Sequence, residues 1–124
     1  MSWLAVGIGA ACGAWLRWGV SIWLNAYHHA LPYGTLIANL AGGYLIGIAV
    51  AFFEKYPALP IEWRLLAVTG FLGGLTTFST FSAEAMILLQ RGEFGWALGH
   101  AALHLLGSLA LCFAGFATYR ALAG

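Results

Sequence analysis

The sequence predicts an all-α integral membrane protein with four transmembrane helices. Of its 124 residues, 62% are hydrophobic and 7% are charged, and the mean hydropathy is +0.87. Soluble domains carry about 25% charged residues, so a membrane is the expected environment. The apolar residues form four stretches of roughly 20 residues, the length that a helix needs to cross the hydrocarbon core. The formal net charge of +1 gives no reason to expect nucleic acid as a partner.

The first two spans are expected at about 3–24 and 33–53. No positively charged segment or small-residue cleavage site opens the chain, so the first apolar stretch is interpreted as a retained span rather than a signal peptide. The polar, turn-prone residues 25–32 separate the two spans. A short charged loop follows the second span, and Pro60 is placed to start the next helix near Ile61.

The third and fourth spans are expected at about 61–90 and 96–119, and the third is broken near 73–78. The break falls in the run GGLTTFSTFS, where two glycines are followed by five hydroxyl side chains and two phenylalanines. Lipid cannot hydrogen-bond a peptide, so such a segment must be buried in protein or line a polar cavity. We therefore expect a permeation or binding site at this break, within a single transmembrane domain that covers 1–124.

Charge specifies the orientation of the chain in the membrane only weakly. With four spans, three basic residues fall on one side and two on the other, a small positive-inside bias. A chain with so little preference can insert both ways, which would allow an antiparallel homodimer of dual topology. The basic residues are Lys55, Arg64 and Arg120 on one side, and Arg17 and Arg91 on the other.

Small residues favour close helix packing, because they let two backbones approach each other in lipid. The favoured interpretation of any single GxxxG pair is packing within one subunit, so these pairs do not by themselves predict the dimer. They are Gly9 and Gly13, Gly43 and Gly47, Gly70 and Gly74, and Gly95 and Gly99.

Helical spacing gathers the remaining polar residues into three stripes that can meet inside a bundle. Phe78 and Phe81 share a face next to the stripe of the third span. The stripes are Thr35, Asn39 and Gly43 on the second span, Thr77, Thr80 and Glu84 on the third, and His100, His104 and Ser108 on the fourth.

Each stripe also has a purely structural interpretation. Threonine and serine often bond back to the carbonyl one turn earlier, a phenylalanine pair can simply pack, and His104 can donate to a neighbouring carbonyl. Asn39 and Glu84 fit this interpretation less well, because an amide needs several partners and a carboxylate at a span centre costs roughly 2.5 to 3.5 kcal/mol. Donors from three spans converging on one break favour a binding or permeation site.

The chemistry of these residues predicts selectivity for a small, strongly hydrated monovalent anion. Hydroxyls, amides, freed backbone N–H groups and the start of a half-helix are all hydrogen-bond donors. The ring edges of Phe78 and Phe81 are also positive. No second basic residue lies at the centre, so a multivalent anion is not expected. Carbonyls released after Gly73 have the opposite polarity and could hold a cation.

Three motifs resemble those of the Fluc (CrcB) family of fluoride channels, and the resemblance covers nearly the whole chain. It implies a dual-topology antiparallel homodimer with two fluoride pores in the cell inner membrane, which exports cytoplasmic fluoride passively. The motifs are Gly34-Thr35-Leu36-x-x-Asn39-x-x-Gly42, Gly70-x-x-Gly73-Gly74-Leu75-Thr76-Thr77-Phe78-Ser79-Thr80-Phe81-Ser82-x-Glu84, and His104-x-x-Gly107-Ser108.

The resemblance also implies roles for individual residues. Gly73 and Thr76 resemble the positions whose backbone carbonyls ligate a sodium ion at the dimer centre, and Arg17 matches a structural arginine of the first helix. For the pore, Phe78 and Phe81 resemble a phenylalanine box, Asn39 a fluoride donor, and Thr80, Glu84 and Ser108 a polar track. Thr77 and His104 are assigned to the same pore, while the position of His100 varies among members.

Two other classes remain open on the sequence. A small dual-topology multidrug or proton-coupled exporter could use Glu84 as its exchanging carboxylate, although such a group is expected on the first span, which has none. A structural subunit could carry the glycine pairs without needing the hydroxyl-rich break. An enzyme is not expected, because the chain has no phosphate-loop motif and no aspartate for a Ser-His-Asp triad.

Overall fold

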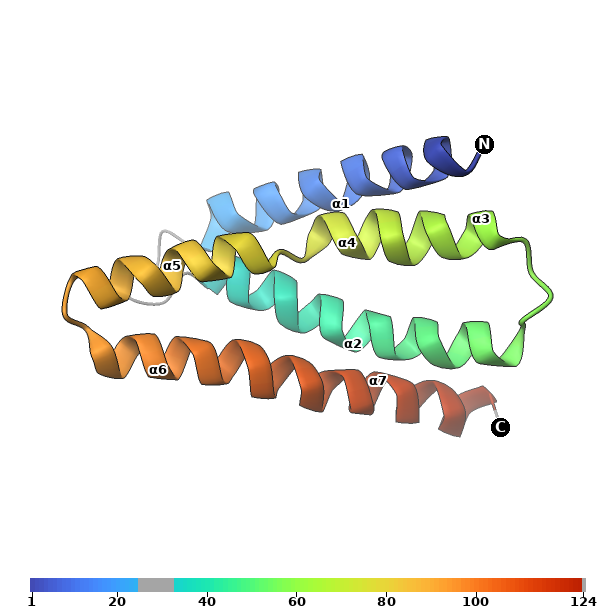
Figure 1. Cartoon of the computed structure of the whole chain (residues 1–124). Coiled ribbons are helices and arrows are strands. Elements are labelled where there is room, and N and C mark those ends of the chain that lie inside the picture. Colours follow the sequence, from blue (N-terminus) through green and yellow to red (C-terminus); the bar gives the residue numbers. More distant parts are fainter. Residues whose placement is uncertain (25–32, 124) are drawn as a thin grey trace.

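The structure, a computed structural model, describes residues 1–24 and 33–123 as an elongated bundle of helices (Figure 1). The expected first loop at 25–32 lies outside the described residues. Helices α1 (Ser2–Leu24) and α2 (Tyr33–Lys55) form the first two spans. The third span consists of α3 (Ile61–Arg64), the π-helix η2 (Leu65–Leu72), α4 (Gly73–Leu75) and α5 (Phe78–Gln90), and the fourth of α6 (Phe94–Ala102), the π-helix η3 (Leu103–Gly107) and α7 (Ser108–Ala123).

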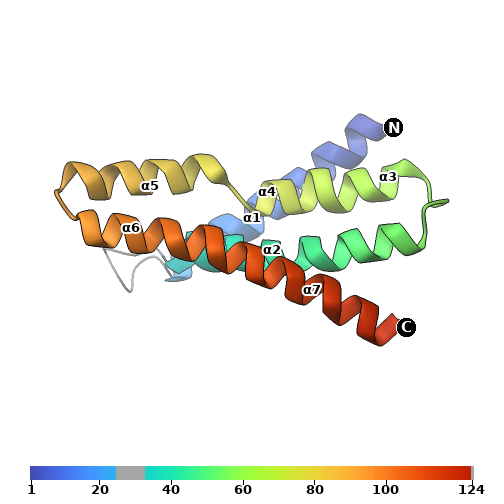
Figure 2. The ribbon, with the colours of Figure 1, turned by 60° about the horizontal axis from the view of Figure 1, so that its bottom comes forward.

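The expectation of an all-helical protein with four spans is confirmed for the described residues. Four helical stretches are long and apolar enough to cross a membrane, at Ser2–Trp23, Tyr33–Lys55, Ile61–Gln90 and Phe94–Ala123. The start of the chain and the end of α7 lie at the same end of the bundle, as an even number of crossings requires (Figures 1 and 2).

The helix ends follow local chemistry. Pro60 occupies the cap position before Ile61, as expected. At the end of α5, the N–H groups of Gly92 and Glu93 donate to the carbonyls of Leu89 and Leu88, and Gly92 has a φ of 75°. Because glycine adopts this left-handed conformation easily, it ends the helix in a Schellman turn. The fourth span then starts at Phe94, two residues earlier than expected.

Glycine brings the helices into close contact inside the subunit. A Cβ atom at Gly13 of α1 would collide with the backbone of η2 and α4, and one at Gly74 would collide with Ala10 of α1. A Cβ atom at Gly47 of α2 would likewise collide with the backbone of α7. By contrast, a Cβ at Gly99 would meet no atom within 4 Å. Three of the four GxxxG pairs therefore pack helices within this subunit, and the pair at Gly95 and Gly99 does not.

The buried apolar core is small and lies beside the end of α4. Ala38, Leu72 and Leu75 form one buried cluster, whereas large side chains such as Leu98 and Phe113 are exposed. Apolar side chains on the outside are expected where a bundle faces lipid. The core therefore stabilises the part of the third span that precedes its extended residues.

Candidate functional site

The backbone of the third span leaves the helical conformation at Thr76 and Thr77. Thr76 has φ −97° and ψ 154°, and Thr77 has φ −153° and ψ 124°, both in the extended region. Helix α4 ends just before these residues and α5 begins just after them, and Figure 2 shows the extended link between the two. Several backbone groups therefore lose their usual helical partners at this point.

Asn39 of α2 supplies new partners for the backbone of Thr77. The N–H of Thr77 donates to Asn39 Oδ1 across 3.0 Å, and Asn39 Nδ2 donates to the carbonyl oxygen of Thr77 across 3.4 Å. In a continuous helix this N–H would instead donate to the carbonyl of Gly73. A side-chain amide carries both a donor and an acceptor, so one asparagine can pair with both groups.

Other side chains satisfy the two helix ends around the extended residues. Thr77 Oγ1 accepts from the N–H of Thr80 across 3.4 Å and so caps α5. On the other side, Arg17 Nε donates to the carbonyl oxygen of Gly74 across 3.0 Å. Thr76 Oγ1 donates to the carbonyl of Leu72 across 2.8 Å. Thr76 therefore behaves as the structural interpretation predicts, because its hydroxyl bonds back to a carbonyl of the preceding turn.

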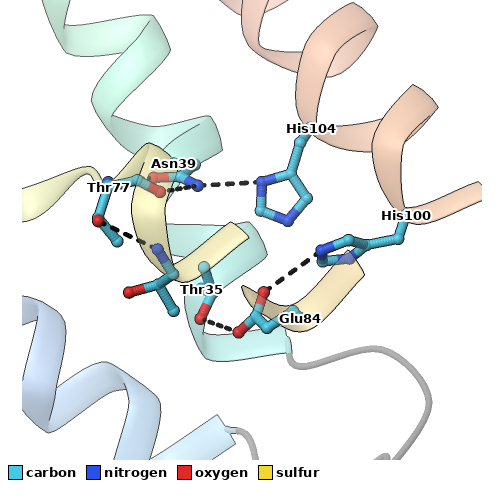
Figure 3. Close-up of polar contacts among 7 residues, drawn as sticks. Thr35, Asn39, Thr77, Glu84, His100 and His104 are labelled. Atoms are coloured by element: carbon cyan, nitrogen blue, oxygen red, sulfur yellow. Dashed lines mark hydrogen bonds and ion pairs between the residues drawn. The ribbon is translucent and has the colours of Figure 1, made fainter. Parts of the chain in front are cut away.

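His104 on η3 meets Asn39 directly, because its Nδ1 lies 3.0 Å from Asn39 Nδ2 (Figure 3). The two hydrogen bonds with Thr77 set the orientation of the asparagine amide, so its Nδ2 is the donor to His104 as well. Nδ1 of His104 must then accept, and the neutral ring carries its proton on Nε2. Nδ1 of His104 therefore accepts a hydrogen bond and does not donate to a neighbouring carbonyl, which was the structural interpretation of this residue.

A second polar group lies one turn away and joins the same three spans. Thr35 Oγ1 donates to Glu84 Oε2 across 2.7 Å, and Glu84 Oε1 lies 3.3 Å from His100 Nε2 (Figure 3). The His100 side chain is 1% exposed. The stripes on α2, α5 and the fourth span thus meet inside the bundle, as their spacing predicts.

Phe81 separates the two histidines from the phenylalanine at the start of α5. Its ring centroid lies 5.4 Å from that of Phe78, 5.1 Å from that of His100 and 4.8 Å from that of His104. The planes of Phe81 and His100 are only 20° apart, so these rings stack. Phe78 is 78% exposed in the subunit, whereas Phe81 is partly buried.

A pocket of about 490 Å³ collects most of the residues that the sequence singles out. Its lining combines the extended segment with the second and fourth spans. Thr80 and Glu84 lie outside this lining, and Arg17 holds the backbone of Gly74 instead. The predicted site residues among those lining the pocket are Asn39, Gly73, Thr76, Thr77, Phe78, Phe81, His104 and Ser108.

Two residues of this constellation were not selected as site residues from the sequence. The sequence places Thr35 only on a stripe, and the resemblance gives His100 no firm pore role because its position varies among members of the family. The four-residue spacing of His100 from His104 was the available signal, since it puts both rings on one helix face. The contact of each residue with Glu84 depends on the packing of three spans.

Comparison with known proteins identifies the relatives of this chain. The sequence model of a family described as "CrcB-like protein, Camphor Resistance (CrcB)" matches residues 4–116. The chain belongs to the CrcB family. The matched CrcB region runs from α1 into α7 and contains every polar contact described above, so the resemblance read from the three motifs is confirmed.

Several relatives match the chain over almost its full length. A protein of Cupriavidus pinatubonensis named "Fluoride-specific ion channel FluC" is 65% identical over 123 residues, which cover 99% of this chain and 98% of that protein. A protein of the same name from Cupriavidus metallidurans is also 65% identical with the same coverage. A third, from Pseudomonas putida, is 60% identical over 98% of this chain and 95% of its own length.

Proposed function

We propose that this CrcB protein is a fluoride-selective ion channel that lets cytoplasmic fluoride leave the cell passively. The observation that carries the proposal is the 65% identity, over nearly the whole of both chains, to proteins named as fluoride-specific ion channels. At such identity the backbone and most of the buried contacts are expected to be shared. The relatives described above do not support the alternative of a small multidrug or proton-coupled exporter.

The pocket beside the extended segment has the chemistry that this function needs. Fluoride is small and strongly hydrated, so each water that it loses must be replaced by a donor. Thr77, Phe78 and Phe81 of the third span and Ser108 of the fourth line one pocket, and they offer hydroxyl donors and positive ring edges. Thr80 and Glu84 continue the polar residues along α5 beyond the pocket. We assign the fluoride path to this pocket and its continuation.

Passive conduction suffices for export. Fluoride enters from acidic surroundings as neutral HF and dissociates inside, and the membrane potential then drives the trapped anion outward. The proposed location is therefore the cell inner membrane, with lipid around the bundle. No energy-supplying catalytic site is needed for this cycle.

The working unit that we propose is an antiparallel homodimer of dual topology. The weak bias of the basic residues permits both orientations. In addition, Phe78 lines the pocket yet is 78% exposed, so an enclosed path requires a further surface to cover it. A second copy of the chain would provide that surface. Reporters fused to the C-terminus and active on opposite sides of the membrane would both give a signal, and a signal from one side only would contradict dual topology.

A sodium ion at the dimer centre is also part of the proposal. The N–H of Thr77 donates to Asn39 and not to Gly73, four residues earlier, and the extended backbone of Thr76 turns its carbonyl out of the helical direction. Carbonyl oxygens are suitable ligands for a hard cation. Gly73 and Thr76 are thus the residues that would hold the ion, whose contribution would be to bind the two subunits together.

The decisive experiment is fluoride efflux from liposomes that contain the purified protein, with valinomycin and a potassium gradient to set the potential. We expect rapid fluoride release and negligible chloride release. The absence of fluoride release, or equal release of chloride, would refute the proposed function.

A further inference from the structure

Three buried polar atoms near the fourth span make no hydrogen bond among the residues that the structure describes, although the carboxylate oxygen and one histidine nitrogen lie 3.3 Å apart as an ion pair. They are Glu84 Oε1, His100 Nε2 and His104 Nε2. His100 is 1% exposed and His104 6%, so both rings are almost fully removed from solvent. Within the described part of the chain, Glu84 Oε1 and His100 Nε2 contact only each other, and Nε2 of His104 has no hydrogen-bond partner. Because a buried polar atom without a partner is costly, this arrangement suggests that a ligand is missing.

The geometry of the three groups suits a metal ion. One candidate ligand atom from each residue lies within 4.8 Å of the others, and Glu84 Oε1 is 3.3 Å from His100 Nε2. Ligands of a tetrahedral zinc ion at about 2.1 Å lie about 3.4 Å from each other. The first pair is therefore already correctly spaced, and His104 would have to come closer to complete the site.

We propose that Glu84, His100 and His104 form a binding site for a divalent transition-metal ion such as zinc, held through Glu84 Oε1 and the Nε2 atoms of both histidines. Two imidazoles and one carboxylate are a ligand set that zinc accepts, with a fourth position left open. Magnesium and calcium prefer oxygen ligands and would bind poorly here. The site uses other residues than the sodium site proposed at Gly73 and Thr76. It shares Glu84 and His104 with the proposed fluoride path, but the argument for it does not rest on the channel function.

The surroundings of two ligands already support metal binding. Thr35 donates to Glu84 Oε2 across 2.7 Å, which orients the carboxylate so that Oε1 points toward His100. The ring of Phe81 stacks on the His100 ring, with 5.1 Å between the two ring centroids, and limits the rotation of the imidazole. Such outer contacts hold ligands in place and often change metal affinity by about 10–100-fold.

The third ligand ties metal binding to Asn39. In the structure, Nδ1 of His104 accepts from Asn39 Nδ2, so the proton of the neutral ring is on Nε2. When Nε2 binds a metal, this proton must move to Nδ1, which then needs an acceptor. The amide of Asn39 can become that acceptor only by turning over, which breaks its pairing with Thr77. Metal binding should therefore disturb the extended segment of the third span.

Titration calorimetry of the detergent-purified protein, carrying a tag without histidine, tests the site with zinc chloride. We expect one zinc ion per chain and no binding of magnesium. Glu84→Gln, His100→Gln and His104→Gln should each weaken zinc binding by at least about tenfold. The double variant His28→Ala/His29→Ala removes the other two histidines of the chain and should bind zinc as the wild type does. If the wild type binds zinc no more tightly than His100→Gln, the proposal is overturned.

A variant that gains affinity separates this site from a simple loss of folding. Asn39→Asp places a carboxylate where it can accept from both Nδ1–H of His104 and the N–H of Thr77, so no turning of the side chain is required. We expect it to tighten zinc binding by about tenfold, and to strengthen the visible absorption of bound cobalt(II), which reports tetrahedral coordination. Unchanged or weaker metal binding by Asn39→Asp would contradict ligation by His104 Nε2. None of these measurements uses ion flux, so failure of the metal site and failure of the channel function are distinguishable.

Discussion

Arg17 Nε donates a hydrogen bond across 3.0 Å to the carbonyl oxygen of Gly74, which joins α1 to the end of α4. In a continuous helix this carbonyl would accept from the N–H of Phe78. The extended residues Thr76 and Thr77 lie between Gly74 and Phe78 and prevent that bond. The guanidinium of Arg17 supplies a charged donor in its place. A cation at the carboxyl end of a helix is also favoured by the helix dipole.

Arg17→Gln should lower the stability of the subunit. Hydrogen bonds that involve a charged group contribute about 1.5–3 kcal/mol and neutral ones about 0.5–1.5 kcal/mol. Glutamine offers the carbonyl of Gly74 only a neutral amide donor in place of Arg17 Nε, so a loss of about 1 kcal/mol is expected. The measurement is the thermal unfolding midpoint of purified protein in detergent. Arg91→Gln is the matched control, because Arg91 lies in the exposed turn after α5 and should change stability by less than about 0.5 kcal/mol. Equal midpoints for Arg17→Gln and wild type would show that this contact is not a structural one.

Asn39→Ala should abolish fluoride conduction and destabilise the protein by about 1–3 kcal/mol. The substitution leaves both backbone groups of Thr77 without their partner and frees Nδ1 of His104. Liposome efflux and thermal unfolding measure the two effects. As a control, Tyr44→Phe removes a hydrogen bond to Thr118 on the opposite half of the bundle and should retain conduction. Unchanged flux in Asn39→Ala would remove Asn39 from the pore.

Phe81→Ile should suppress fluoride efflux by more than about tenfold while leaving assembly intact. The branched side chain keeps most of the apolar volume but lacks the positive ring edge and the stacking surface for His100. Efflux is compared with the elution volume on size exclusion. Phe113→Ile alters a phenylalanine that is 76% exposed on α7 and does not line the pocket, so its flux should match wild type. Dissociation of Phe81→Ile into monomers would instead assign Phe81 a packing role.

Gly13→Ala should destabilise the bundle by about 1–3 kcal/mol through overpacking. The added methyl group would meet the carbonyl oxygen of Phe71 and the backbone nitrogen of Leu75, which cannot move without displacing the helix. Gly19→Ala on the same helix is the control, because its methyl group would meet no atom within 4 Å. There, better helix propensity should raise stability by up to about 1 kcal/mol. Similar unfolding midpoints for the two variants would contradict the close packing of α1 against the third span.

Much of the secondary structure was predictable, because a membrane span needs a long apolar stretch and ends at recognisable residues. The second span begins at Tyr33 and the third at Ile61, as expected. Helices α2 and α7 extend beyond their expected ends, since Lys55 and Arg120 remain helical. A charged residue in the last helical turn can reach the membrane surface without ending the helix, so charge placed these boundaries too early.

The candidate site was predictable as a set of stripes but not as a set of contacts. Spacing alone puts Asn39 and Thr35 on one face of α2, yet it does not say that Asn39 pairs with Thr77 while Thr35 pairs with Glu84. These partners differ because the packing of α2 against the third span places Asn39 beside the extended residues and Thr35 beside α5. Likewise, only the packed bundle brings His100 next to the carboxylate of Glu84.

The sequence by itself determined the four spans, the position of the hydroxyl-rich segment and the family, because each depends on residue type and order along the chain. The tertiary structure decided which backbone groups of that segment form hydrogen bonds and which side chains are their partners. Asn39 and Arg17 reach it from two other helices, and their reach depends on the close approach that glycines such as Gly13 and Gly74 permit. It also decided the tautomer of His104, since a ring proton is placed by the hydrogen bond that the other nitrogen accepts.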